Sequence, residues 1–281
     1  MPLAEIMQVL AHRRSPHQVD ALLTAHLCRL EQGLVDARRE LSAARSLLDT
    51  QESSMAPSSL TFAGPDFASA LAAVRYAVSL DAEFPTLGGV LLDIAGGSVP
   101  LVATDRYRLA AATISAHEAD TISRAVVLPA TFADTIATSA APEISLMIDT
   151  ATITARAGSV TVRGELILDQ VPDYRRLLPT NDEPAIPIDV ELCAAVAVST
   201  PRTMEREHDG VSFPAVVLVA TADDQIVVSD QLDGVGVIQE FLLEAIDAGG
   251  ESQLWLSLDG PVSPLVIRSS RAVRVLMPVR M

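Results

Sequence analysis

The sequence predicts an α+β protein in which an N-terminal coiled-coil helix precedes two copies of one mixed unit of helices and strands. Two observations carry this prediction: a 3.5-residue repeat of Leu and Ala over residues 20–50, and a repeated order of helix, strands, helix and strands from residue 60 onward. Composition fits two ordinary cores, because 49% of the 281 residues are apolar while only 4% are aromatic. The cores should therefore be built from aliphatic side chains.

The first predicted element is a helix that spans most of residues 1–50. Its apolar residues alternate at spacings of four and three, which is the period of a coiled-coil seam. A helix with such an apolar stripe needs a partner. Self-pairing into a homodimer through residues 20–50 is the preferred interpretation, and folding back onto the following unit is the alternative. The residues expected to mediate dimerisation are Leu23, Leu27, Leu30, Leu34, Leu41 and Leu48.

Residues 51–59 are predicted to be a linker, because they contain Gln, Glu, Ser and Pro and no periodic apolar pattern. One domain is expected over residues 60–180 and a second over 186–281, with helices on one face of each sheet. The first should contain helices at 66–80 and 130–138 and strands at 89–94, 99–103, 109–114, 144–148, 152–155 and 160–168. The second should contain helices at 190–199 and 239–248 and strands at 211–220, 225–230, 253–258, 264–269 and 272–279.

Three tracts of these units carry the most informative motifs. They are residues 102–110 (VATDRYRLA), 171–179 (VPDYRRLLP) and 275–281 (VLMPVRM). In this order and spacing they resemble the second and third domains of the bacterial DNA polymerase III β sliding clamp. In that family the three tracts wall one cleft that receives short linear peptides from polymerases and other clients. The resemblance covers residues 60–281 and implies two sliding-clamp-like (DNA clamp) domains.

The resemblance also implies a peptide-binding cleft in this chain. Arg106 and Tyr107 stand where Gly and His are usual in the family, so Tyr107 could fill the pocket for a client side chain and Arg106 would alter its rim. The alternative interpretation is that these residues only pack the junction between two domains. The positions assigned to the cleft are Thr104, Tyr107, Leu109, Pro172, Leu177, Val275, Met277, Pro278, Val279 and Arg280.

The charge of the chain argues against sliding on DNA. All 20 basic residues are Arg, and the formal net charge of −16 falls on the part after Thr50, because six Arg and six acidic residues balance before it. In a clamp ring the helices carry Lys and Arg toward the DNA, whereas the four predicted helices here contain a single Arg, Arg75. Such a surface would repel a duplex. A replicative ring is therefore not expected.

The N-terminal segment resembles the dimerisation end of MerR-type transcription regulators, with residues 26–32 (HLCRLEQ) followed by Leu34, Ala37, Arg38 and Leu41. The first hypothesis is accordingly a non-enzymatic MerR-type regulator with a clamp-like effector module, which contacts DNA only through a winged helix missing upstream. The alternative is a clamp-derived peptide-binding protein acting in DNA replication or repair. A degenerate processivity factor is a third, less favoured hypothesis.

Enzymatic chemistry is not predicted. The sequence contains no phosphate loop, nucleophile elbow or HExxH motif, so no catalytic residue, cofactor or metal site is expected. Cys28 and Cys193 lie too far apart to suggest a disulfide framework. No apolar run approaches the ~18 residues that span a bilayer. We expect a cytoplasmic protein without a membrane partner.

Overall fold

The structure is a computed structural model that divides into two units, residues 1–55 and residues 56–281. The described residues are 19, 26, 58–81, 83–94, 97–119, 124–168, 173–179, 185–188, 190–205, 212–221, 223, 225–231, 234–250, 253–260 and 262–279. The predicted coiled-coil seam and its dimerisation leucines, Leu23, Leu27, Leu30, Leu34, Leu41 and Leu48, lie outside them. That element stays a prediction. None of the described helices is long and apolar enough to cross a membrane.

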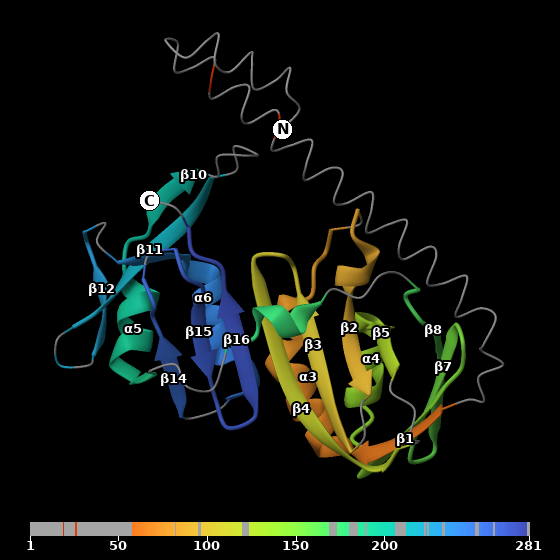
Figure 1. The fold of residues 1–281 in the computed structure, drawn as a ribbon. Helices are drawn as coiled ribbons and strands as arrows, with labels where there is room; N and C mark the ends of the chain where they lie inside the picture. Colours follow the sequence, from red (N-terminus) through yellow and green to blue (C-terminus); the bar gives the residue numbers. More distant parts are fainter. Residues whose placement is uncertain are drawn as a thin grey trace. The chain divides into compact units, whose positions relative to one another are not determined.

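The first half of the second unit builds one antiparallel sheet system with two helices (Figure 1). Its strands are β1 (Ser58–Ala63), β2 (Gly89–Ile94), β3 (Ser98–Thr104), β4 (Arg108–Ala119), β5 (Arg124–Pro129), β6 (Glu143–Ile148), β7 (Thr152–Ala157) and β8 (Val160–Glu165). Its helices are α3 (Gly64–Val74) and α4 (Ala130–Ala137), with short 3₁₀ turns η1 (Arg75–Ala77), η2 (Pro85–Gly88) and η3 (Tyr174–Leu177). Pro65 at the first turn of α3 favours a helix start there, since its missing N–H would have no partner in any case.

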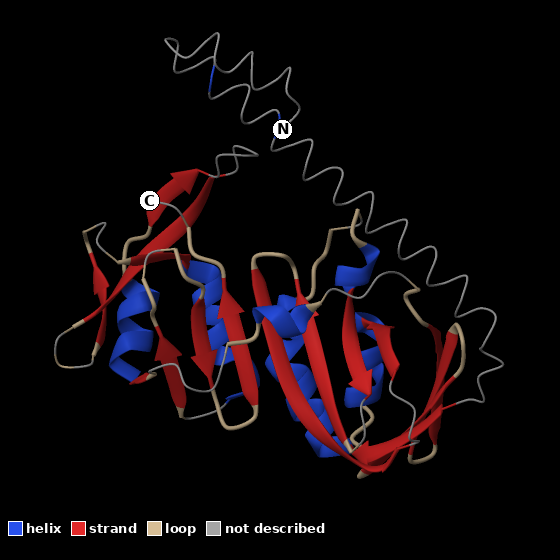
Figure 2. Ribbon diagram, viewed as in Figure 1, coloured by secondary structure: helices blue, strands red, loops and turns tan. Residues whose placement is uncertain are grey.

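The second half repeats the order strand, helix, four strands, helix and three strands, with mostly shorter elements (Figure 2). Its strands are β9 (Ile186–Ile188), β10 (Arg202–Glu205), β11 (Ser212–Ala220), β12 (Ile226–Ser229), β13 (Val235–Ile238), β14 (Leu254–Ser257), β15 (Leu265–Arg268) and β16 (Ala272–Leu276). Its helices are α5 (Val190–Val198) and α6 (Gln239–Asp247), followed by the 3₁₀ turn η4 (Ala248–Gly250). All the strand pairs between named elements are antiparallel.

The strand β4 joins the two halves into one continuous sheet. It pairs with β1 and β3 of its own half and with β16 of the other half. One strand order runs β8-β7-β6-β1-β4-β16-β15-β14-β9, and β3, β2 and β5 branch from it at β4. The strands β10 to β13 form a separate four-stranded sheet. Because β4 comes from the first half and β16 ends the second, tracts that lie about 165 residues apart in the chain become neighbours.

Side chains alternate along these strands between two apolar layers, as the period of two in a strand requires. On β2, Val90, Leu92 and Ile94 face the helices within a large cluster that also contains Phe62 and Phe67. A second cluster, from Leu192 to Leu276, fills the other half. The remaining face of β2, β3, β4, β5 and β16 forms a third, smaller cluster, which is the floor of the candidate site described below.

Most predicted strands and all four predicted helices of the clamp-like part are present, with three corrections. The predicted linker 51–59 is wrong at its end, because β1 begins at Ser58 and pairs with both β4 and β6. The helix predicted at 66–80 starts earlier and leaves α-helical geometry after Val74. The strands β5, β9, β10 and β13 were not predicted, since most are only three or four residues long and show no clear alternation.

Candidate functional site

The candidate site lies on the sheet face that does not contact α3 and α4. Its floor is a cluster of buried side chains from five strands and the η3 turn: Leu91, Val102, Leu109, Val127, Tyr174 and Val275. Partly buried Ala111, Ile167, Leu178 and Val273 pack around it. All three tracts singled out in the sequence contribute to this cluster or border it.

The register of β4 against β16 brings the first and third tracts together. Leu109 lies directly opposite Val275, and each is 3% exposed. Beyond the last strand pair, the backbone N–H of Met277 donates to the carbonyl oxygen of Tyr107 at 2.8 Å. The backbone N–H of Val279 donates to the Gly236 carbonyl at 2.8 Å, which anchors the end of the third tract on β13.

The second tract reaches the same place through Tyr174. Its ring is 5% exposed within the floor cluster, and its hydroxyl donates to the carboxylate of Asp93, which is 4% exposed. Burial, and then the hydrogen bond to Asp93, raises the pKa of Tyr174 to about 12. Arg175 donates to the same carboxylate oxygen, and Arg176 pairs with Asp173 at 3.5 Å. Both Arg175 and Arg176 are therefore engaged with nearby carboxylates.

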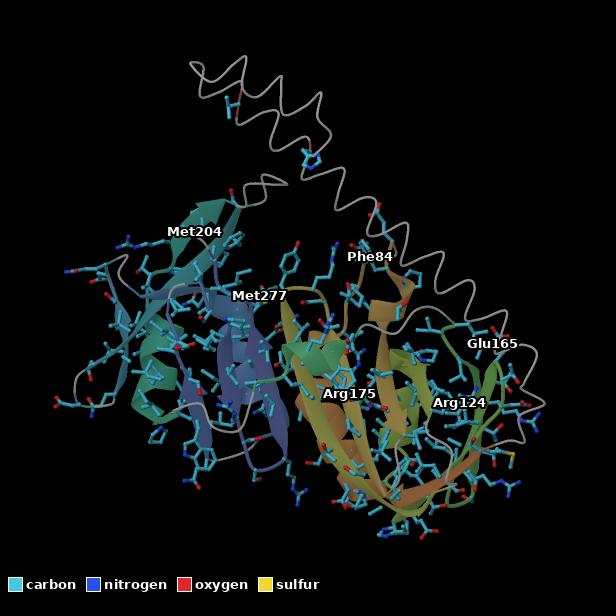
Figure 3. All side chains as sticks on the ribbon, viewed as in Figure 1. Phe84, Arg124, Glu165, Arg175, Met204 and Met277 are labelled. Carbon is cyan, nitrogen blue, oxygen red and sulfur yellow. The ribbon has the colours of Figure 1, made fainter. Side chains whose placement is uncertain are left out.

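Two predicted site residues remain exposed beside the floor. Leu177 is 56% exposed at the end of η3, and Met277 is 47% exposed just after β16 (Figure 3). Thr104, Pro278 and Val279 are half-buried, and the Thr104 hydroxyl donates to the Arg108 carbonyl at 2.8 Å. Pro172 and Arg280 lie outside the described residues. Apolar surface exposed next to a buried apolar floor is the composition expected of a protein-binding patch.

A small pocket opens at one end of the floor, with a cavity volume of about 20 Å³. Its lining is mainly apolar and comprises Thr86, Leu87, Gly89, Leu91, Val102, Ala103, Thr104, Val127 and Tyr174. A volume of this size holds roughly one water molecule. Tyr174 lines this pocket, whereas Tyr107 is not among its lining residues, and the role expected for Tyr107 stays a prediction.

A charged cluster fixes the turn between β3 and β4 against α6. The guanidinium of Arg108 donates to Asp105 at 2.8 Å and to Glu244 of α6, and it lies 4.1 Å from the ring centroid of Phe241. Its side chain is only 11% exposed. This contact links the two halves next to the candidate site, and sequence reasoning did not identify it.

Asp93 was also missed, although the sequence contained a signal for it. It is the single charged residue within the apolar run of β2, GVLLDI. A buried carboxylate requires hydrogen-bonding partners, so its presence in a buried strand indicates a specific tertiary contact. The sequence could not show that the partners would be Tyr174 and Arg175, which lie about 80 residues later.

The described part of the chain places buried and exposed apolar side chains at this site, next to paired charges. No group of three His, Cys, Asp or Glu side chains among its residues could hold a metal ion. The ionisable side chains at the floor are engaged with one another, as in the Asp93, Tyr174 and Arg175 set.

Comparison with known proteins identifies the fold. A family model described as the central domain of the DNA polymerase III beta subunit matches residues 62–173. The chain is 29% identical to the beta sliding clamp of Streptomyces coelicolor, in a match that covers 79% of this chain and 66% of that protein. Crystal structures of DNA polymerase sliding clamps from Pseudomonas aeruginosa and Bacillus subtilis are similar, with TM-scores of 0.66 and 0.65 at 20% and 19% identity.

These two structural matches cover 79% of this chain and 66% and 64% of the clamp chains. The chain thus spans just under two thirds of the length of the relatives that it matches. Its matched part has the sliding-clamp fold and carries DNA polymerase III beta clamp-like domains, which confirms that part of the resemblance. The findings lend no support to the MerR-type resemblance of residues 1–50, which stays a prediction.

Proposed function

We propose that this chain is a non-enzymatic, clamp-derived protein that binds short linear peptides of clamp clients and thereby acts in DNA replication or repair. Two clamp-like domains, residues 60–180 and 186–281, would form the binding module. One observation carries the proposal: three tracts far apart in the sequence converge on one apolar floor, where Leu109 faces Val275 and Tyr174 closes the cluster. If these residues only packed the junction between the two domains, the apolar side chains of Leu177 and Met277 would not need to remain exposed beside it.

The exposed side chains of Leu177 and Met277 supply the surface that an incoming peptide would cover. Burying apolar surface contributes roughly 25 cal/mol per Å², and a few such anchors dominate most interfaces. The pocket of about 20 Å³ is too small for a Leu or Phe side chain. The anchor of a peptide would therefore pack on Leu177 and Met277, above the floor, unless Tyr174 moves.

The charges of the helices favour peptide binding over sliding on DNA. The four helices α3, α4, α5 and α6 contain no basic residue within their bounds. They contain six acidic residues: Asp66, Asp134, Glu191, Glu240, Glu244 and Asp247. Arg75, directly after α3, donates to the Asp134 carboxylate through three contacts of 2.9 to 3.1 Å, which neutralises its charge. DNA affinity depends on cationic contacts with phosphates, and these helices supply none.

Titration of a fluorescently labelled clamp-binding peptide tests the proposal. Leu177→Ala and Met277→Ala should each weaken binding about 5- to 30-fold, the range of an interface anchor. Val198→Ala and Val262→Ala are matched controls, because these residues are 82% and 77% exposed and do not belong to the floor cluster. No saturable signal up to millimolar peptide, or equal losses in the controls, would overturn the proposal.

The homodimer predicted through residues 20–50 is compatible with this function but independent of it. Its test is the molecular mass in solution before and after deletion of residues 1–50. A change from dimer to monomer is the predicted result, and an unchanged mass would show the seam assignment to be wrong.

A further inference from the structure

Arg106 adopts a backbone conformation that favours glycine. Its φ angle is 83°, in the left-handed region that L side chains rarely occupy. This explains physically why Gly is usual at this position in sliding clamps. The turn holds the conformation through side-chain acceptors: Thr104 accepts the Arg106 N–H at 3.3 Å, and Asp105 accepts the N–H groups of Tyr107 and Arg108 at 3.0 and 2.9 Å. Strained residues of this kind persist where surrounding contacts fix them, and they cluster at binding sites.

The guanidinium of Arg106 is oriented by two groups of the preceding segment. It stacks over the ring of Phe84 at 4.1 Å from the centroid, and its Nη2 donates to Asp81 at 3.2 Å. Asp81 engages one of the five N–H donors, in contrast to the three contacts that join Arg75 and Asp134. The Arg106 side chain is 46% exposed. The remaining N–H donors of Arg106 are therefore available to a ligand, and the contacts with Phe84 and Asp81 already hold the plane of the guanidinium in place.

The position of this guanidinium relates it to the candidate site. Arg106 contacts Phe84 on one side, while the next residue, Tyr107, binds the backbone of Met277 on the other. The turn between β3 and β4 thus lies between Phe84 and Met277 (Figure 3). A peptide anchored on Met277 would bring its neighbouring residues close to Arg106.

We propose that Arg106 is a specificity-determining residue that selects peptides with a carboxylate adjacent to the apolar anchor. A planar guanidinium with free donors matches a carboxylate, and its stacking on Phe84 reduces the entropy lost when it binds. The inference rests on the proposed peptide-binding function and adds a substrate class to it. Two other cations close to the floor are held differently: Arg108 is only 11% exposed between Asp105 and Glu244, and Arg175 neutralises the buried carboxylate of Asp93, whereas the Asp81 partner of Arg106 is itself 37% exposed. With a net charge of −16 the chain should otherwise disfavour acidic peptides.

A thermodynamic cycle on the full chain tests this selectivity. Two peptides that differ only by Asp or Asn beside the anchor are titrated against the wild-type protein and against Arg106→Gly. The wild type should bind the Asp peptide about three- to fivefold more tightly at low salt, the range of an exposed charge pair. Arg106→Gly should lose that preference while binding the Asn peptide as before. Gly suits the backbone at this position, so the variant should fold, as its thermal melt would report.

The outcomes separate this inference from the function on which it rests. Equal affinity of the wild type for the two peptides, or a preference that persists in Arg106→Gly, would overturn the selectivity alone. Absence of saturable binding by either peptide would remove the proposed function and this inference together. A preference that decreases with added salt in the wild type, and is absent in Arg106→Gly at every salt concentration, would support it.

Discussion

Replacement of Tyr174 by Phe tests the contact that holds the η3 turn on the sheet. The change removes one hydroxyl and leaves the ring in the floor cluster, where Tyr174 is 5% exposed. Among the described residues, the carboxylate of Asp93 would then keep only the hydrogen bond from Arg175. Since Asp93 is 4% exposed, water cannot easily replace the lost donor.

The expected loss of stability follows from the charge of the acceptor. A hydrogen bond to a charged group contributes roughly 1.5–3 kcal/mol, so the free energy of unfolding should fall by about 2 kcal/mol. In a unit of this size each kcal/mol corresponds to about 2–4 °C, so the melting temperature should fall by about 4–8 °C. Hydrogen exchange of residues 173–179 should accelerate, because these residues lose a contact to the sheet.

The matched control is Tyr76→Phe, the same chemical change at a partly buried tyrosine whose hydroxyl oxygen is buried. Among the described residues the hydroxyl of Tyr76 has no hydrogen-bond partner. Removal of a buried, unsatisfied hydroxyl should be neutral or stabilising. Urea and thermal denaturation, followed by circular dichroism, measure both variants. The reasoning fails if Tyr174→Phe stays within about 0.5 kcal/mol of wild type, or if Tyr76→Phe costs as much as Tyr174→Phe.

Two further predictions concern pH and packing. The pKa of Tyr174 is raised to about 12 in the folded state, while an unfolded tyrosine titrates near 10. The unfolded state therefore loses this proton first, and the free energy of unfolding should fall as the pH rises from about 10 to about 12. Urea melts at about pH 9 and about pH 11 should show a smaller fall for Tyr174→Phe than for wild type, and an identical fall would contradict the assignment. Gly89→Ala should cost about 1–3 kcal/mol by overpacking, because a Cβ there would lie 2.5 Å from the carbonyl oxygen of Leu128. At Gly88 the nearest atom to an added Cβ is 3.8 Å away, so Gly88→Ala should melt close to wild type, and equal losses in the two variants would refute the packing argument.

Much of the fold could be predicted from the sequence, because apolar and polar residues alternate along several strands and because recognisable residues bound the helices. The predicted range 89–94 coincides with β2, and Ala130–Ala137 differs from the predicted helix by one residue. The strand β1 was not predicted, and its first residues, Ser58 and Ser59, resemble linker residues. Their strand conformation comes from pairing with Ile148 and Met147, which lie far away in the sequence.

The candidate site could be predicted in its residues but not in its contacts. The three tracts indicated Leu109, Leu177 and Val275, and the floor cluster does bring the first and last together. The role of Asp93 depends on where η3 lies relative to β2, and no local pattern encodes that placement. The left-handed backbone conformation of Arg106 is likewise a property of the folded turn. The sequence indicated only the position, because Arg106 stands where Gly is usual in the family.

The most direct test of the account is to map where a bound peptide lies. A clamp-binding peptide carrying a photoreactive phenylalanine at its anchor position would be cross-linked to the full chain, and the modified residues would be located by mass spectrometry. The account predicts adducts within residues 104–109, 173–179 and 275–279, which are reduced by excess unlabelled peptide. Competed adducts confined to the helices α3 to α6, or to residues 1–55, would contradict it.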